Sequence, residues 1–341
     1  MKSHQQFSLQ KNNSFAIIAT TPVIYYPKDN HELKLLASVT QGSFYILGEG
    51  SNTLFVEDHT PVIIKPEFLG INVSETKDYY EVTAACSENW HDLVCFCINQ
   101  GINGLENLAL IPGSVGAAPV QNIGAYGVEI ADFIECVTWF EFDKNKSQQF
   151  TNSQCEFEYR NSIFKHNLKN KGIITHVTLR FTKNWQAKLS YQGLNRLSES
   201  CSAVDIMNTV IELRNSKLPD PKIIPNAGSF FKNPVVCADQ FKLLQNRFPE
   251  LPFYPQENGS VKLAAGWLIE KAELKGYQIN GVAVHDQQAL VLTNIDSAKG
   301  ENIKNLAIYV QKTVFEFFGI SLQPEVRMIA EHGEVIMKEI N

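Results

Sequence analysis

Short apolar runs alternate with polar, glycine or proline breaks through much of this chain, and they predict its strands. Near the N-terminus such runs predict strands at Phe15–Ala19, Ser43–Leu47, Thr53–Val56 and Val62–Ile64. Apolar segments further along predict strands over residues 133–142, 172–181, 279–284 and 289–293, and a last one at Pro324–Ile329. Beyond the break at Leu218–Lys222, the mixture of predicted helices and strands suggests a compact α+β unit.

A helical period is clearest over Ser87–Gln100, where one face carries only large apolar side chains and Gly101 supplies a stop signal. That face consists of Trp90, Leu93, Val94, Cys97 and Ile98. A second helix is predicted over residues 204–217, with Ser202 and Asp205 placed to form a capping box. Further helices are predicted over residues 238–247, 263–274 and 301–318. The proline-rich break Leu218–Lys222 between them predicts a domain boundary.

The segment Gly104–Gly127 stands apart, because glycine, alanine and serine are concentrated in it while seven Leu, Ile and Val side chains keep it apolar. Small residues allow close approach to another surface, and glycine adopts backbone angles that other residues avoid. A buried loop of this kind needs partners for its N–H groups, and a flat, anionic cofactor would supply them. A packed corner explains the composition equally well.

A second glycine segment, Gly48–Thr53, begins like a dinucleotide-binding fingerprint. Thr53 replaces the third glycine, and a predicted strand follows where the fingerprint requires a helix. The Rossmann interpretation is therefore rejected, and with it a flavin-free Rossmann dehydrogenase. Taken alone, the segment is most simply a hairpin turn.

Bulk composition narrows the function classes further. The 341 residues suggest two or three domains, and a hydrophobic content of 44% is enough for real cores. A net charge of −6 argues against a general nucleic-acid binder. The seven cysteines include no C-x-x-C pair, so reduced thiols in the cytoplasm are expected, and the eight histidines show no metal-ligand spacing. We expect no metal site, signal peptide or membrane-spanning segment.

Three polar positions are candidates for chemistry. Ser229 follows a small-residue turn, but no base lies beside it in sequence and no nucleophile elbow surrounds it, so a hydrolase is a poor interpretation. Arg160 carries a planar fork suited to a carboxylate, although a lone arginine is usually a surface cation. Glu325 lies at the start of a predicted strand, where a carboxylate is often merely solvated.

Positive charge gathers in one region of this acidic chain, where Arg214, Lys217, Lys222 and Lys232 outnumber Asp220. Local fields steer a ligand more than net charge does, so this imbalance fits a site for anionic ligands. A solvated basic helix end is the alternative interpretation.

Several of these segments together resemble the UDP-N-acetylenolpyruvoylglucosamine reductases, flavoenzymes of peptidoglycan precursor synthesis. The resemblance runs from about residue 12 to 336 and includes four segments in the family's order: Gly104–Gly127, Asn226–Asn233, Val261–Ile269 and Pro324–Arg327. It implies a two-subdomain FAD-binding fold of the vanillyl-alcohol-oxidase/PCMH type with a C-terminal α+β substrate-binding domain. The implied domains are residues 1–70 joined by 321–341, residues 71–218 and residues 219–320.

The resemblance also implies site residues. FAD, bound non-covalently, would contact Gly48, Gly50, Ser51, Asn52, Ile111, Pro112, Gly113, Ser114, Gly116, Gln121, Ile123, Gly124, Tyr126, Arg214 and Arg327. The diphosphate and uridine of the substrate would contact Tyr191, Lys217, Asn233, Tyr254 and Gln288. Tyr191 implies the longer subclass of the family, which has a tyrosine-bearing loop.

The implied reaction is the reduction of UDP-N-acetylglucosamine enolpyruvate to UDP-N-acetylmuramate, with NADPH as the hydride source. Arg160, paired with Glu325, would stabilise charge on the carboxylate, and Ser229 would supply the proton. The protein is expected to act as a cytoplasmic monomer with no nucleic-acid or membrane partner. Two alternatives stay open: a flavin oxidase on the same fold, and a colourless nucleotide-sugar-binding protein.

Overall fold

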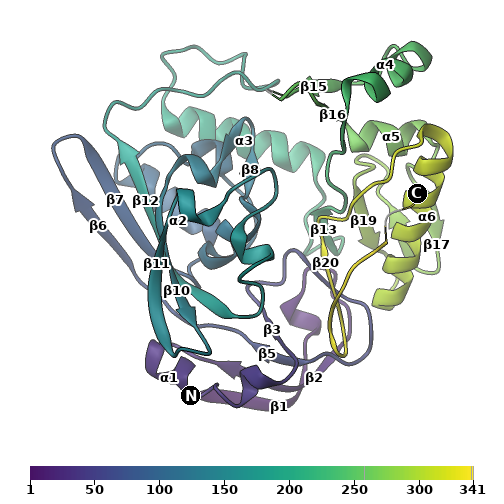
Figure 1. Ribbon diagram of the computed structural model, residues 1–341. Coiled ribbons are helices and arrows are strands. Elements are labelled where there is room, and N and C mark those ends of the chain that lie inside the picture. The colour runs from purple at the N-terminus through teal and green to yellow at the C-terminus, as the bar shows by residue number, and fades with distance from the viewer. Residues whose placement is uncertain (257, 339, 341) are drawn as a thin grey trace. The chain divides into compact units, whose positions relative to one another are not determined.

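The computed structural model describes every residue except Glu257, Glu339 and Asn341, so the end of the predicted segment 321–341 lies partly outside the described residues. The chain forms two compact units, each built from three separate stretches of sequence. The first unit comprises Met1–Phe7, Thr21–Glu49 and Pro61–Ser216, and the second comprises Ser8–Thr20, Gly50–Thr60 and Lys217–Asn341. Each unit is described by itself below, with the element labels of Figure 1.

The first unit contains two sheets. The smaller has the order β1-β2-β5-β3, with strands β1 (Lys2–Ser8), β2 (Thr20–Tyr26), β5 (Val62–Ile64) and β3 (Phe44–Ile46). Its three last strands pair in parallel. After β2 comes the short helix α1 (Asn30–Lys34), which begins where the Asp29 side chain accepts a hydrogen bond from the backbone N–H of Glu32.

The larger sheet of this unit is antiparallel throughout, in the order β11-β10-β12-β7-β6. Its strands are β6 (Ile71–Glu75), β7 (Tyr79–Ala85), β10 (Ile134–Glu141), β11 (Lys146–Thr151) and β12 (Gly172–Thr182). The unit also contains the two-stranded hairpin of β8 (Gly124–Ala125) and β9 (Val128–Glu129), and the helices α2 (Trp90–Asn99) and α3 (Ala203–Lys217).

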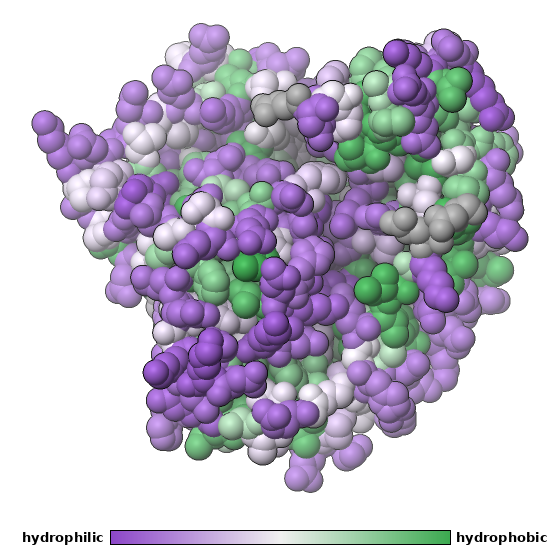
Figure 2. Space-filling model, in the orientation of Figure 1, coloured by the Kyte–Doolittle hydropathy of each residue, from purple (hydrophilic) through white to green (hydrophobic). Residues whose placement is uncertain are grey.

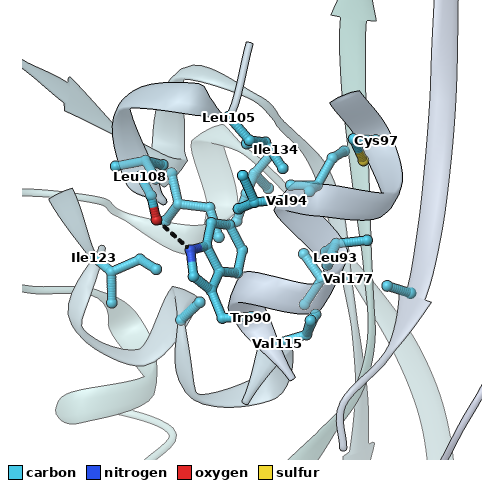
Figure 3. Close-up of a cluster of buried hydrophobic side chains, with 14 of the residues drawn as sticks. Trp90, Leu93, Val94, Cys97, Leu105, Leu108, Val115, Ile123, Ile134 and Val177 are labelled. Atoms are coloured by element: carbon cyan, nitrogen blue, oxygen red, sulfur yellow. Dashed lines mark hydrogen bonds between the residues drawn. The ribbon is translucent and has the colours of Figure 1, made fainter. Parts of the chain in front are cut away.

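Helix α2 supplies the centre of this unit's core (Figure 3). The predicted apolar face of Trp90, Leu93, Val94, Cys97 and Ile98 is buried, as the helical period required. The helix begins one residue after Asn89, whose side chain accepts a hydrogen bond from the N–H of Asp92. The capping box of α3 is also confirmed, because Ser202 and Asp205 exchange reciprocal hydrogen bonds.

The second unit contains three small sheets. Their orders are β13-β19-β18-β17, β14-β16-β15 and β21-β20-β4. The strands are β4 (Thr53–Phe55), β13 (Asn226–Ser229), β14 (Val235–Val236), β15 (Phe253–Pro255), β16 (Val261–Leu263), β17 (Gln278–Ile279), β18 (Val282–Val284), β19 (Val291–Asn294), β20 (Arg327–Ala330) and β21 (Gly333–Val335). The helices are α4 (Ala238–Arg247), α5 (Ala265–Lys271) and α6 (Gly300–Phe318), and α6 packs on β18 and β19.

Two of the predicted strands differ in the structure. The strand expected at Phe15–Ala19 is absent, because Ala16 has a φ of 54° and the buried Asn13 side chain bonds the backbone of Ile17. The strand expected over residues 279–284 is two strands, because Asn280 and Gly281 form a tight turn with positive φ.

The segment that follows β3 is not a hairpin turn. Strand β3 pairs with β5, whereas β4 pairs with β20, so no ladder joins the two strands on either side of Gly48–Thr53. A strand does follow Gly50, which agrees with the rejection of a Rossmann motif. The predicted C-terminal strand is confirmed as β20, and it runs parallel to β4 near the start of the chain.

Polar side chains cover most of the face seen in Figure 2, with smaller apolar patches among them. All seven cysteines are free thiols, and burial raises the pKa of Cys86, Cys97 and Cys155 to about 12. The described residues include no helix long and apolar enough to span a membrane, and no group of three or more acidic, histidine or cysteine side chains that could hold a metal ion.

Candidate active site

The glycine- and alanine-rich loop of the first unit wraps around the first turn of α2. The Trp90 indole Nε1 donates to the carbonyl oxygen of Leu108 at 2.9 Å, the bond drawn in Figure 3. The backbone N–H of Trp90 donates to Gly113 at 2.9 Å, and the N–H of Val115 donates to the carbonyl oxygen of Glu88 at 2.9 Å. The loop is therefore fixed on both sides of the stretch 109–112.

The two glycine segments that the sequence singles out lie against each other in this unit. A Cβ atom at Gly48 would stand 2.8 Å from the hydroxyl oxygen of Ser114, so no larger residue fits there without displacing that side chain. Beside this contact, the Asn89 side-chain amide donates to the Glu49 carboxylate at 2.8 Å. The start of α2 thus connects both glycine segments.

These segments present backbone donors that nothing in the described chain accepts. The N–H groups of Gly48, Glu49, Ile111, Gly113 and Ser114 make no hydrogen bond to any residue that the structure describes. Gly113 and Ser114 are buried, and buried backbone donors in proteins are almost always paired. Convergent N–H groups in glycine-rich turns form a cradle for an anion such as a pyrophosphate.

A second feature of this unit is a group of cations and tyrosines. The Nε atom of Arg214 on α3 is buried and has no hydrogen-bond partner among the described residues. Burial lowers the pKa of Arg214, the neighbouring Tyr126 raises it, and the charge on Arg160 lowers it again. The rings of Tyr126 and Tyr191 meet edge to face with centroids 5.0 Å apart. Burial also raises the pKa of the Tyr126 hydroxyl. An anionic ligand would supply an acceptor for the Nε atom of Arg214.

Arg160 is held in place by the loop it faces. It lies at the tip of a tight turn, closed by backbone bonds between Glu158 and Asn161, and has a φ of 54°. Its Nη2 atom donates to the carbonyl oxygen of Gly124 at 2.9 Å. The structure thus brings Arg160, Gly124, Tyr126, Tyr191 and Arg214 together in the first unit. Their roles in one site stay a prediction.

Sequence reasoning missed the residue that supports this turn. Asn122 is buried, and its side-chain amide donates to the Glu129 carboxylate at 2.6 Å and to the carbonyl oxygen of Glu158 at 3.1 Å. Its side-chain oxygen accepts from the N–H of Ala131 at 3.1 Å. Its position between Gln121 and Ile123, both predicted contacts, was the available signal.

The remaining predicted cofactor contacts of the first unit line the same loop. Pro112 is exposed, Gly116 donates its N–H to the carbonyl oxygen of Cys86 at 2.9 Å, and Gln121 ends a 3₁₀ turn. Ile123 is buried and donates its N–H to Ala118 at 3.1 Å. Pro112 and Gln121 are thus accessible at the loop surface, whereas Ile123 belongs to its core.

In the second unit, β13 and the segment before β20 bring Ser229 and Glu325 together. The N–H of Glu325 donates to the carbonyl oxygen of Phe230 at 2.7 Å, and Phe231 forms an antiparallel bridge with Pro324. Ser229 is partly exposed at the end of β13. A serine hydroxyl and a carboxylate are therefore held on adjacent, hydrogen-bonded segments.

Asn52, from the segment before β4, is hydrogen-bonded to the same segment that carries Glu325. The Asn52 side-chain amide donates to the carbonyl oxygen of Glu325 at 3.2 Å, and the N–H of Arg327 donates to Asn52 at 3.1 Å. The carbonyl oxygen of Ser51 accepts a hydrogen bond from the Ser14 hydroxyl. Gly50 has a φ of 71°, and a Cβ atom there would overlap the backbone of Asn12.

Arg327 has a strong partner of its own. Its guanidinium donates to both carboxylate oxygens of Glu334, at 3.1 and 2.7 Å. This bidentate pair, partly shielded from water, fixes the arginine against the β20–β21 hairpin.

The predicted substrate contacts of the second unit form one group and two separate positions. Asn233 caps α5 by accepting a hydrogen bond from the N–H of Ala265 at 2.9 Å. The Gln288 side-chain oxygen lies 3.3 Å from where a Cβ of Gly266 would stand, so it faces the same helix end. Lys217 is exposed at the end of α3, and Tyr254 is exposed on β15.

Comparison with known proteins agrees with this geometry. Residues 22–145 match a family model described as an FAD binding domain, and residues 220–329 match one described as the C-terminal domain of UDP-N-acetylenolpyruvoylglucosamine reductase. The UDP-N-acetylenolpyruvoylglucosamine reductase of Escherichia coli strain K12 is 46% identical over 332 residues, which is 96% of this chain and 97% of that protein. The chain belongs to the UDP-N-acetylenolpyruvoylglucosamine reductase family.

Other relatives agree with this assignment. The UDP-N-acetylenolpyruvoylglucosamine reductase of Pseudoalteromonas translucida is 46% identical over 327 residues, covering 96% of both chains. The crystal structure of the Thermus caldophilus reductase matches with a TM-score of 0.67 at 21% identity, covering 96% of this chain and 98% of that one. The chain therefore has the α+β fold of the UDP-N-acetylenolpyruvoylglucosamine reductases, and residues 22–145 match an FAD binding domain. That this part is of the vanillyl-alcohol-oxidase/PCMH type stays a prediction. The three-domain division with boundaries at 70, 218 and 320 stays a prediction.

The residues present fit FAD. Both glycine segments of the first unit fall within or beside the stretch matched by the FAD-binding family model, and their unpaired N–H groups suit a pyrophosphate. Close packing at Gly48 and Gly116 excludes larger side chains from these two positions. The buried Nε of Arg214 has no acceptor among the described residues. A flavin dinucleotide satisfies all of these features at once.

Proposed function

We propose that this protein is an FAD-dependent oxidoreductase that reduces UDP-N-acetylglucosamine enolpyruvate to UDP-N-acetylmuramate with NADPH, a step of peptidoglycan precursor synthesis. Two observations carry the proposal. The N–H groups of Gly48, Glu49, Ile111, Gly113 and Ser114 find no acceptor among the described residues. The chain is also 46% identical to a named reductase over nearly its whole length. FAD, when bound, supplies the transfer of a hydride from NADPH to the vinyl carbon of the substrate.

Arg160 holds the substrate carboxylate in this proposal. Addition of a hydride to the vinyl group leaves negative charge that spreads into that carboxylate, and a guanidinium fork matches its two oxygens. The turn closed by Glu158 and Asn161 and the bond to Gly124 fix the guanidinium before the reaction. Such preorganised donors contribute about 3–4 kcal/mol each to transition-state stabilisation.

Ser229 donates the proton that completes the reduction. A serine hydroxyl is a weak acid, but its partner is a strongly basic enolate carbon, so transfer is favourable when the geometry is fixed. Glu325 lies on the segment bonded to Phe230, beside Ser229, and orients the serine or relays a proton to it. Tyr191, Lys217, Asn233, Tyr254 and Gln288 would hold the diphosphate and uridine.

The same proposal has the protein act as a cytoplasmic monomer, with FAD held non-covalently and no nucleic-acid or membrane partner. Three visible spectra of the purified protein test its central part under anaerobic conditions. We expect a flavin band that NADPH bleaches and that UDP-N-acetylglucosamine enolpyruvate restores. Fast recovery in air without that substrate would instead favour a flavin oxidase, and a colourless protein a binding function.

A further inference from the structure

His91 makes a contact that the proposed reaction does not use. It lies in the first turn of α2, partly buried, and its Nδ1 atom accepts a hydrogen bond from the backbone N–H of Leu110 at 3.1 Å. An imidazole nitrogen accepts only when it carries no proton, so this bond requires a neutral ring with its proton on Nε2. The Cys95 sulfur packs beside the ring, 3.7 Å from Nε2 and 3.9 Å from Nδ1.

Leu110 is held in a conformation that it would not adopt alone. Its φ is 57°, in the left-handed region that disfavours a side chain with a Cβ atom. The bonds from Trp90 fix the loop at Leu108 and at Gly113, on either side. Between these two points the loop is bonded to the side chain of His91 through the N–H of Leu110. This bond therefore helps to fix the backbone conformation from Leu110 to Gly113.

This stretch leads directly into the donors of the anion cradle. Ile111 follows Leu110 directly, and the N–H groups of Ile111, Gly113 and Ser114 donate to no acceptor among the described residues. A change at Leu110 turns the plane of the next peptide and so moves the N–H of Ile111.

We propose that neutral His91 is a positioning residue for FAD, and that its protonation releases Leu110 and weakens FAD binding at low pH. The inference rests on the proposed function. A protonated Nδ1 becomes a donor facing the Leu110 N–H, which is also a donor, so the bond is replaced by repulsion. The loop then relaxes, and the cradle loses its fixed geometry.

The groups around His91 favour the neutral ring. Asp92 and Cys95 face it from α2 and Arg214 faces it from α3, while residues 108–111 of the loop contribute no titratable side chain. Burial lowers the pKa of His91, Asp92 raises it, and the positive charge of Arg214 lowers it. The ring is therefore neutral near pH 7, and it takes up its proton only at a pH below its ordinary pKa of 6.5.

Titration of the flavin-free, full-length chain with FAD, followed by quenching of flavin fluorescence between about pH 8 and 5.5, tests this inference. For the wild type we expect Kd to rise as the pH falls, by at most about tenfold per pH unit, since one proton is linked to binding. In His91→Asn an acceptor that does not titrate replaces Nδ1, so Kd at pH 8 stays near the parent value and the pH dependence is lost. In His91→Leu the acceptor is gone, and Kd rises about tenfold at every pH.

The matched control is His31→Asn, which changes an exposed histidine on α1 and should keep the full pH dependence. A flat wild-type Kd, or an unchanged slope in His91→Asn, overturns the inference and leaves the proposed function standing. Absence of FAD binding by the wild type at pH 8 overturns the proposed function, and this inference with it.

A second measurement reads the protonation state of the His91 ring directly in the wild-type protein. In the wild-type protein labelled with nitrogen-15 at histidine, the His91 signals should show an unprotonated Nδ1 and a protonated Nε2 at neutral pH. The signals are assigned by their loss in the variant. A proton on Nδ1 contradicts the bond to Leu110 and overturns the inference.

Discussion

The backbone N–H of Glu325 donates to the carbonyl oxygen of Phe230 at 2.7 Å, which fastens the segment before β20 to the residue that follows Ser229. The bond joins positions far apart in the chain, so the carboxylate and the hydroxyl share one local frame. Because the contact is between backbone atoms, substitution of either side chain leaves the frame intact. Side-chain variants at these two positions therefore report on chemistry more than on folding.

Replacement of Ser229 by alanine should separate the two halves of the reaction. We expect bleaching of the flavin by NADPH at the parent rate, and reduction of the enolpyruvyl substrate slowed by about 10²–10⁴-fold, the usual contribution of a general acid. Stopped-flow spectroscopy measures each half separately. Ser74→Ala, on the exposed strand β6, is the control and should leave both rates unchanged. Normal turnover by Ser229→Ala would exclude the serine as the proton donor.

Replacement of Arg160 by lysine keeps the charge and removes the fork. We expect kcat to fall about 10²-fold, because one preorganised donor to the developing charge is lost, while the affinity for FAD stays within about twofold. Steady-state kinetics and a flavin titration measure the two effects. Arg180→Lys, at an arginine paired with Glu81 on the larger sheet, serves as the control. An unchanged kcat would show that the guanidinium plays no part in the chemical step.

Close packing at Gly116 makes a stability prediction. A Cβ atom there would overlap the Cys86 side chain and lie 3.1 Å from the Cα of Cys86, so backbone must move. Gly116→Ala should lower the free energy of unfolding by about 1–3 kcal/mol, the usual effect of overpacking. Urea denaturation measures it. At Gly42, where the nearest atom to a Cβ is 3.6 Å away, the same substitution should change stability by less than about 0.5 kcal/mol. Equal stability of the two variants would contradict the close approach.

His176 on β12 links stability to pH. Burial lowers the pKa of this side chain below its ordinary value of 6.5. As the pH falls through 6.5 the unfolded chain takes up a proton before the folded chain does, so the free energy of unfolding decreases until the folded pKa is passed. Denaturation at about pH 7.5 and 5.5 should therefore show a smaller loss for His176→Asn than for the parent protein. His31→Asn should lose as much as the parent. A loss in His176→Asn equal to the parent's would rule out this linkage.

Local hydrophobic periodicity predicted the helices more completely than the strands. The apolar face and the C-terminal end of α2 could be predicted, because the helical period and Gly101 act within a few residues. Its start was placed at Ser87, whereas the helix begins at Trp90, after the Asn89 cap. The run at Phe15–Ala19 has the composition of a strand, yet Asn13 bonds its backbone into a turn. That outcome depends on a buried amide finding its partners, which no hydrophobic pattern encodes.

Some features of the candidate site could likewise be predicted from the sequence, and others could not. Arg160, Gly124, Tyr126 and Arg214 could be predicted as members of one site because the family resemblance covers the segments that carry them. The contact between Gly48 and Ser114 joins distant parts of the chain, so neither segment predicts it alone.

His91 and Asn122 were missed for a different reason. The contacts that give them their roles are to backbone groups of neighbouring segments: the Leu110 N–H for His91, and the Glu158 carbonyl oxygen and Ala131 N–H for Asn122. The arrangement of such partners exists only after the loops have folded, so residue identities alone do not predict these contacts.

The parallel pairing of β4 with β20 has a consequence during synthesis. Strand β4 leaves the ribosome early, but its partner β20 is synthesised only near the end of translation. Until then, the edge of β4 that pairs with β20 stays unpaired. The larger sheet of the first unit, in contrast, draws all its strands from residues 71–182 and is complete much sooner. On the nascent polypeptide, the larger sheet is therefore ready to fold while the closing strand next to Glu325 is still untranslated.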